Sequence, residues 1–217
     1  MSNPQSWQLA FGGAISTPRK RPRQQRSAET FEAILDAAAQ LFGRYGYAAT
    51  TTNKVAERAG VSIGSLYQYF PNKDALLYAL GERHMRQFAG EFRAVLARLR
   101  EEGPGLEESV RALVQAVADM HRADPVMHRL LYDQAPRPPE AARQMRDLQR
   151  WAAAEVERHL CRLGVGGPDP ALTALLLVQA MEAQVHGAVL EPPPGRSSDE
   201  VIEAVVRLCL NALRRPS

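Results

Sequence analysis

Apolar residues recur at helical spacing along almost the whole chain after residue 27, and no stretch keeps the strict alternation of a β-strand. Clusters of glycine and proline interrupt this periodicity and mark where helices end. The pattern therefore predicts an all-α protein. The expected helices cover, approximately, residues 27–45, 52–59, 63–69, 73–102, 106–122, 125–134, 140–163, 170–190 and 198–214.

Side chains that can cap a helix stand in front of several of these segments. Their oxygen atoms can accept hydrogen bonds from the first amide groups of a helix, which have no partner within it. Gly60 can end the second helix, and Ser197 with Glu200 has the spacing of a capping box. The predicted N-caps are Thr51, Ser62, Asn72, Asp124 and Asp169.

The fourth predicted helix follows Asn72 and continues to about Glu102. At 1.5 Å per residue it would span about 45 Å, which is more than a small three-helix unit requires. We therefore interpret it as the connection between two domains. The chain is expected to divide into a flexible arm at residues 1–26, an N-terminal domain at 27–72 and a larger helical domain at 73–217.

Charge is distributed unevenly between these parts. The formal net charge is +3, but residues 1–73 hold nine Lys and Arg against four Asp and Glu, whereas residues 74–217 hold eighteen against twenty. A basic N-terminal part beside a nearly neutral remainder suggests a polyanionic partner for that part alone. The composition is otherwise that of a soluble globular protein, 45% apolar and 24% charged, which excludes a wholly disordered chain.

The two cysteines, Cys161 and Cys209, are expected to be small core residues with free thiols in a reducing cytoplasm. A disulfide or a reactive thiol is the alternative. No secretory signal is expected, because the apolar stretch at residues 7–15 precedes the basic cluster rather than following it. We therefore expect a cytoplasmic protein.

The segment 51–70 joins two helices, each too short to be stable alone, through a turn that contains Gly60. Its apolar residues can pack both helices against the first helix, so the polar side of the second short helix faces outward. This is the arrangement of a helix-turn-helix, in which one helix contacts the DNA backbone and the next enters the major groove. The outward residues are Gly64, Ser65, Tyr67, Gln68 and Tyr69.

Residues 27–80 contain, in this order, the motifs Ala37-Ala38, Leu41-Phe42, Gly46-Tyr47, Thr50-Thr51, Val55-Ala56, Ala59-Gly60-Val61-Ser62, Gly64, Leu66-Tyr67, Tyr69-Phe70, Asn72-Lys73 and Leu76. With these motifs they resemble the DNA-binding domain of the TetR (tetracycline repressor) family of transcriptional regulators. The remaining residues resemble the family only in being helical and of the right length. The resemblance implies a sequence-specific DNA-binding regulator, expected to be a homodimeric repressor that a small organic ligand releases from an inverted-repeat operator.

Individual DNA contacts are also implied by this resemblance. Thr51 and Lys73 match phosphate contacts of the family. Tyr67 matches a tyrosine that packs on the sugar-phosphate backbone and donates its hydroxyl to a phosphate, and Tyr69 occupies a position that often holds histidine. The positions where family members meet base edges are Ser62, Gly64, Ser65 and Gln68. A glutamine can bind adenine through two hydrogen bonds, although not adenine alone.

Two further groups of basic residues are candidates for contacts with the DNA backbone. Lys54 stands in the first turn of its helix, where an acid would suit the helix dipole better, and a nearby phosphate would explain a cation there. In the arm, five cations fall within eight residues, and Arg19, Arg21 and Arg23 are the expected contacts with phosphates or a narrow minor groove. A solvated tail is the alternative for the arm.

Residues 170–190 are apolar on nearly every side and carry one formal charge, on Glu182. A membrane span is not favoured, because polar residues interrupt the segment and no second span accompanies it. A helix without a polar face is instead expected to be buried on two sides, in its own core and against a second copy. In the TetR family the last two long helices form such a four-helix interface, and ordinary packing within one chain is the alternative. The expected interface residues are Leu175, Gln179, Glu182, His186, Ile202, Val205, Val206, Cys209 and Leu213.

The resemblance also implies a small ligand among the central helices. The methionines of this part suit an adaptable apolar pocket, so we expect a largely apolar organic effector, whose identity the sequence does not indicate. Each candidate lining residue has an ordinary core or surface role as its alternative. The candidates are His121, His128, Tyr132, Trp151, Glu155 and His159.

The sequence contains no recognisable catalytic or cofactor-binding motif, such as a phosphate-binding loop, a dinucleotide fingerprint or a nucleophile elbow. His159 and Cys161 point about 200° apart on a helix and cannot share a metal, and His121 and His128 straddle the break at Asp124. We expect no enzyme activity, no cofactor and no bound metal. The main alternative is a DNA-binding regulator or architectural dimer that has no effector, and a small-molecule enzyme is a remote one.

Overall fold

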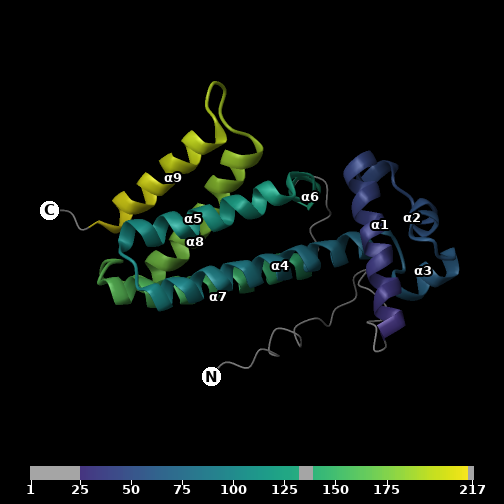
Figure 1. Ribbon diagram of the computed structural model, residues 1–217, viewed down its shortest axis with the longest axis horizontal. Coiled ribbons are helices and arrows are strands. Elements are labelled where there is room, and N and C mark those ends of the chain that lie inside the picture. The colour runs from purple at the N-terminus through teal and green to yellow at the C-terminus, as the bar shows by residue number, and fades with distance from the viewer. Residues whose placement is uncertain (1–24, 132–138, 215–217) are drawn as a thin grey trace. The chain divides into compact units, whose positions relative to one another are not determined.

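The computed structural model describes residues 25–131 and 139–214, and all regular structure within these ranges is helical (Figure 1). The all-α prediction is confirmed. The helices are α1 (Gln25–Ala49), α2 (Thr52–Ala59), α3 (Ile63–Tyr69), α4 (Lys73–Glu102), α5 (Leu106–Ala123), α6 (Pro125–Arg129), α7 (Pro139–Leu163), α8 (Pro170–Leu190) and α9 (Ser198–Leu213).

The predicted caps are confirmed where the structure describes them. The side-chain oxygen atoms of Thr51, Ser62 and Asp169 accept hydrogen bonds from the first turns of α2, α3 and α8. Ser197 and Glu200 form the reciprocal bonds of a capping box at the start of α9. Asn72 and Asp124 accept bonds from the amide groups of the third residues after them, at the starts of α4 and α6. Local side-chain chemistry therefore sets the starts of these helices.

The described residues fall into two compact units. The first contains residues up to His84 and the described residues between Arg129 and Gln144, and the second contains Met85–His128 and the residues from Met145 onward. The division lies inside α4, whereas the sequence-based boundary was expected at its start. The first twelve residues of α4 therefore belong to the same unit as α1, α2 and α3.

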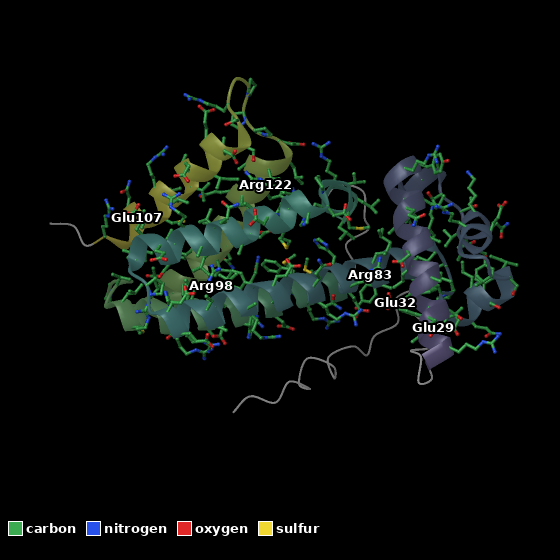
Figure 2. All side chains as sticks on the ribbon, viewed as in Figure 1. Glu29, Glu32, Arg83, Arg98, Glu107 and Arg122 are labelled. Atoms are coloured by element: carbon green, nitrogen blue, oxygen red, sulfur yellow. The ribbon has the colours of Figure 1, made fainter. Side chains whose placement is uncertain are left out.

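The first unit has a core in which α2 and α3 pack against α1 (Figure 1). Phe31 of α1 packs on Phe70, with ring centroids 4.8 Å apart. Arg83 ties α4 to α1, because its guanidinium lies 2.7 Å from Asp36 and 3.2 Å from Glu32. Figure 2 labels Arg83 on α4 and Glu32 on α1. The fully buried side chains of this unit include Ile34, Leu35, Phe42, Val55, Leu66, Phe70, Leu76 and Leu80.

The second unit buries one continuous apolar core, to which α4, α5, α7, α8 and α9 contribute. Helix α9 packs on both α5 and α8, and the ion pair of Arg122 with Asp199 joins α5 to α9 on the outside. Both cysteines have free thiols. Cys209 is buried in the core as expected, and burial raises the pKa of its thiol, whereas Cys161 is exposed.

Candidate nucleic-acid interface

Helices α2 and α3 are joined by a tight turn at Gly60, whose φ of 68° lies in the left-handed region that glycine adopts without strain. The turn is closed by a hydrogen bond from the amide of Val61 to the carbonyl of Ala56, at 3.0 Å. Val55 and Leu66 are completely buried, one on each helix. These contacts determine which side of α3 packs inward and which side remains exposed.

The exposed side of α3 carries the polar residues expected to contact DNA. The ring of Tyr67 is 41% exposed, and its hydroxyl lies 3.1 Å from the hydroxyl of Thr52 at the start of α2. Gln68 and Gly64 are exposed as well. A Cβ atom at Gly64 would meet only the hydroxyl of Ser62, at 3.8 Å, so the backbone there is open to close approach. The two helices thus present one polar surface.

Ser62 and Ser65 stand together at the N-terminus of α3. Ser62 caps the helix by accepting a bond from the amide of Ser65 at 3.0 Å, and the two hydroxyl groups are 2.9 Å apart. Ser62 is exposed and Ser65 is partly exposed. Both hydroxyl groups are therefore at the surface beside Gly64, although the capping bond occupies part of the bonding capacity of Ser62.

Tyr69 requires a correction, because it does not lie on this surface. Its ring is only 8% exposed and packs edge-on against Phe31, with the centroids 6.1 Å apart. Its hydroxyl lies 3.0 Å from that of Ser27 in α1. Tyr69 is three residues after the buried Leu66, so the helical repeat turns it toward α1. It has a structural role between α3 and α1.

Lys54 and Lys73 both reach the C-terminal end of α1. The ammonium of Lys73 donates to the carbonyl of Tyr47 at 2.7 Å, and that of Lys54 donates to the carbonyl of Ala49 at 3.2 Å. Gly46, whose φ of 77° is not helical, interrupts α1 just before these residues, so both lysines donate to carbonyl groups that lie beyond this break. An ammonium has three N–H donors, so both lysines retain donors for a further acceptor such as a phosphate.

Two residues beside this surface were missed in the sequence. Thr52 aligns the hydroxyl of Tyr67, and Tyr45 is a 49% exposed aromatic residue with the cations of Arg44 and Lys54 at 5.2 Å and 5.9 Å from its ring centre. Exposed cations beside an aromatic face suit contact with a nucleic-acid backbone. The run Arg44-Tyr45 ahead of a predicted helix-turn-helix was the available sequence signal.

Tyr47 fixes the end of α1 to the start of α4. Its hydroxyl donates to the carboxylate of Asp74, and Lys73 lies 4.1 Å above its ring. Burial and the neighbouring Asp74 raise the pKa of Tyr47 well above its ordinary value of 10.0. Tyr47 therefore stays protonated at any physiological pH and holds this junction together. The expected contacts Arg19, Arg21 and Arg23 lie outside the described residues.

The candidate effector residues do not gather in one place. His159 of α7 lies 2.8 Å from the hydroxyl of Ser109 and 3.2 Å from the guanidinium of Arg162, and burial together with Arg162 lowers its pKa. His121 is twelve residues beyond Ser109, which is about 18 Å further along α5. His121 and His128 do lie together, with stacked rings 4.1 Å apart.

The other candidates have neighbours of their own. The ring of Trp151 packs edge-on against Phe92 at 6.3 Å, with Arg93 at 5.1 Å from its centre. Glu155 forms ion pairs with Arg100 and Arg158. Tyr132 lies outside the described residues. Trp151 therefore has an ordinary role in packing, and Glu155 has one in ion pairing.

The expected dimer residues of α9 require a correction as well. Ile202, Val205, Val206, Cys209 and Leu213 are all buried within the chain's own core, where α9 packs on α5 and α8. No surface of these side chains is left for a second copy. On α8, the expected interface residue Gln179 is exposed, and the other three are half-buried: Leu175, Glu182 and His186. Burial raises the pKa of Glu182.

Helix α8 nevertheless keeps a large apolar surface. Leu172 and Leu176 are 51% and 55% exposed, and Gln179 and Ala183 continue the same face at helical spacing. By length and composition, α8 alone within the described residues is apolar enough to cross a membrane, and 22% of its most apolar stretch is buried. Exposed apolar surface of this extent indicates contact with a partner or a membrane.

The fold and the exposed polar face of α2 and α3 define a helix-turn-helix DNA-binding protein. Comparison with known families agrees with this class. Residues 34–80 match the model of bacterial regulatory proteins of the TetR family, and residues 105–213 match the tetracyclin repressor-like C-terminal domain. The chain therefore belongs to the TetR family, which consists of regulators rather than enzymes.

Individual relatives give the same result. The HTH-type transcriptional regulator RutR of Escherichia coli K12 is 34% identical over 114 residues, or 51% of each chain, so the chain spans about half the length of the curated relatives it matches. A TetR/AcrR-family transcriptional regulator from Thermobifida fusca has a TM-score of 0.64 and 25% identity over 88% of this chain and 100% of its own. SmeT in complex with triclosan has a TM-score of 0.61 and 25% identity over 87% of this chain and 93% of SmeT.

Proposed function

We propose that this protein is a sequence-specific transcriptional repressor of the cytoplasm, in which the surface of α2 and α3 reads DNA. The observation that carries the proposal is the exposed polar face of α3, where the hydroxyl of Tyr67 lies 3.1 Å from that of Thr52 in α2. Tyr67, Thr51, Lys54 and Lys73 supply hydroxyl groups and cations for phosphates, while Gln68 is placed to reach base edges. Backbone contacts then fix the position of the helix, and Gln68 contributes to the choice of sequence.

The protein is proposed to bind as a homodimer through α8. The five apolar side chains of α9 that were expected at the interface are buried. The interface is therefore revised to the exposed α8 face of Leu172, Leu176, Gln179 and Ala183, with the exposed Leu208 of α9 as a further candidate. A second copy would remove this surface from water, and a two-fold axis would match two inverted half-sites about one DNA turn, or a multiple of it, apart.

Sedimentation of the full chain tests the dimer. Leu176→Glu is expected to convert the dimer to a monomer without loss of helical circular dichroism. Val126→Glu, at an apolar residue of α6 that is 51% exposed, is the matched control and is expected to stay dimeric. Monomeric wild-type protein, or dissociation by both variants alike, would remove α8 as the interface.

Control by a small, largely apolar organic effector is the further part of this proposal. SmeT, which has the same fold, is known in complex with the organic molecule triclosan. In this chain α4 is one uninterrupted helix: Arg83 ties its first part to α1, while Phe92, Leu96 and Leu99 join the core of the second unit. A ligand that shifts the later part of α4 would therefore act on the DNA-binding unit as well.

Selection of bound duplexes from a random DNA pool, followed by footprinting, tests the function. The expected result is an enriched inverted repeat with two protected half-sites. A single asymmetric site would contradict the dimer, and no enrichment would contradict the function. Once an effector is found, calorimetry should give a 5–150-fold weaker affinity for the operator complex than for free protein. Equal affinities would favour the alternative, a regulator or architectural dimer without effector control.

A further inference from the structure

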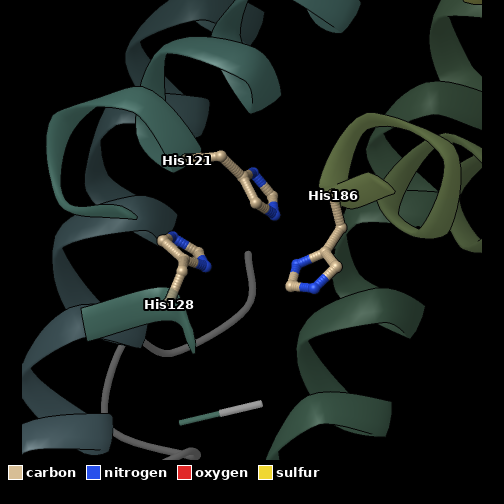
Figure 3. A group of neighbouring side chains, drawn as sticks. All are labelled: His121, His128 and His186. Carbon is tan, nitrogen blue, oxygen red and sulfur yellow. The ribbon is translucent and has the colours of Figure 1, made fainter. Parts of the chain in front are cut away.

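Three histidines from three different helices meet within the second unit. His121 lies in the last turn of α5, His128 in α6 and His186 near the C-terminal end of α8. Each ring offers a nitrogen that can ligate a metal, and these nitrogens all lie within 4.8 Å of one another. Figure 3 shows the three rings directed toward a common space.

The turn between α5 and α6 brings the first two histidines together. Asp124 accepts a hydrogen bond from the amide of Met127 at 2.9 Å, and Pro125 begins the new helix, so the chain changes direction between His121 and His128. Their rings stack with an interplanar angle of 21°. The ring of His186 approaches that of His121 edge-on, with the centroids 5.3 Å apart.

The hydrogen bonding of His121 suits a metal ligand. Its Nδ1 lies 2.8 Å from the carbonyl oxygen of Val117, and because a carbonyl can only accept, Nδ1 donates. In the neutral ring the lone pair is then on Nε2, which is buried. A ligating histidine commonly donates its other N–H to a backbone carbonyl in this way, which fixes both the tautomer and the orientation of the ring.

The chemistry of the donor set limits which ion fits. Imidazole nitrogen suits zinc, copper, nickel and cobalt, whereas calcium and magnesium prefer oxygen ligands. Zinc binds nitrogen at about 2.0–2.1 Å, so the nitrogens of a tetrahedral site are roughly 3.4 Å apart. Movements of about 1 Å by the side chains would bring the present arrangement to that spacing.

We propose that His121, His128 and His186 bind a divalent transition-metal ion, with zinc as the expected occupant. This departs from the sequence-based expectation that no metal is bound. The inference goes beyond the proposed DNA-binding function and does not depend on it, because all three ligands lie within one unit. Three histidines leave a fourth position on the ion for water or for a donor atom of a small molecule.

Titration of the metal-free full chain, purified without a histidine tag, with Co²⁺ tests this site. The expected result is one Co²⁺ per chain with the visible absorption bands of tetrahedral cobalt, which Zn²⁺ abolishes by displacement. His121→Gln and His186→Gln are each expected to weaken Co²⁺ binding on the order of 100-fold or more, because even outer-shell changes cost 10–100-fold. His159→Gln, which removes a buried histidine elsewhere, is the matched control.

A second measurement uses only wild-type protein and therefore does not depend on how the variants fold. In the chain labelled with ¹⁵N-histidine, Zn²⁺ is expected to shift the imidazole resonances of three of the five histidines. Absence of Co²⁺ binding by wild type would overturn the proposal. So would binding that survives both cluster substitutions in folded protein, or a Zn²⁺ response confined to histidines outside the cluster.

Discussion

The two units of the chain place their polar groups in opposite environments. On α2 and α3, Tyr67 and Gln68 are at the surface, where water can satisfy them until a partner arrives. In the second unit, His121 and His128 are almost completely buried, at 1% and 2% exposure. Buried polar groups cost free energy unless the protein or a bound partner satisfies them. The polar groups of the first unit are therefore open to a large partner from solvent, whereas those of the second unit lie among the side chains of that unit.

Helix α3 alone has the same contrast between a buried side and an exposed side. The largest expected effect, a loss of stability, tests this contrast. Leu66→Ala removes a completely buried side chain of α3, and should lower the free energy of unfolding by about 2–5 kcal/mol. Gln68→Ala, on the exposed side, should change it by no more than about 0.5 kcal/mol. Chemical unfolding followed by circular dichroism measures both. Equal losses of unfolding free energy in the two variants would contradict the assignment of Leu66 to a buried side and Gln68 to an exposed side of α3.

The next effect concerns what the exposed side does. Gln68→Ala should lose about 1–3 kcal/mol of discrimination at one base pair in each half-site, because a side chain that is proposed to read a base edge is removed. Binding to duplexes that vary at single positions measures this loss. A uniform loss on every sequence would instead make Gln68 a backbone contact.

Lys73→Ala should weaken binding to operator and random DNA alike. The slope of the logarithm of affinity against the logarithm of salt concentration should become flatter by roughly one, because one proposed phosphate contact is lost. Arg83→Ala is the matched control, since Arg83 is also a cation of α4 but pairs with Glu32 and Asp36. An unchanged slope for Lys73→Ala would mean that Lys73 donates only to the carbonyl groups of α1 and contacts no phosphate.

The two tyrosines of α3 allow a finer comparison. Tyr67→Phe should weaken DNA binding by about 0.5–1.5 kcal/mol and leave stability nearly unchanged, because its hydroxyl is at the surface. Tyr69→Phe should do the reverse, since its hydroxyl lies beside Ser27 within the unit. Binding and unfolding measurements on both variants test this difference. A loss of DNA binding confined to Tyr69→Phe would mean that Tyr69, and not Tyr67, contacts DNA.

The smallest expected effect belongs to the second unit and depends on pH. Burial lowers the pKa of His159 in the folded chain below its ordinary value of 6.5, with Arg162 adding to the effect. The unfolded chain therefore binds a proton more readily, and stability should fall as the pH decreases from about 6.5 through the folded pKa. His159→Gln should show a shallower fall than wild type in unfolding midpoints at pH 7.5 and 5.5. Identical pH dependence would exclude this contribution.

Much of the first unit could be predicted from sequence because its signals are local. The caps Thr51 and Ser62, Gly60 in the turn and the buried spacing of Val55 and Leu66 each act within a few residues. Tyr69 was misplaced because both sides of a short helix offer aromatic residues, and only the contact with Phe31 decides between them.

The second unit was less predictable because its features depend on distant residues. His121 and His186 are 65 positions apart, and no spacing rule relates them. The break at Asp124 between His121 and His128 was recognised, but no metal was expected there, and the sequence did not indicate that their rings stack. The apolar residues of α9 have a spacing that fits either a core or an interface. Their burial follows from the packing of α9 on α5 and α8, which sequence periodicity does not specify.

The most direct test of whether the surface of α2 and α3 recognises a DNA sequence compares two affinities. These are the affinities for a selected duplex and for a scrambled duplex, measured at the same physiological salt concentration. A specific DNA-binding protein is expected to prefer its site by about 10³-fold or more. We predict a preference of that size for wild-type protein, and a smaller one for Gln68→Ala. Equal affinity of the wild-type protein for both duplexes would contradict sequence-specific regulation by this chain.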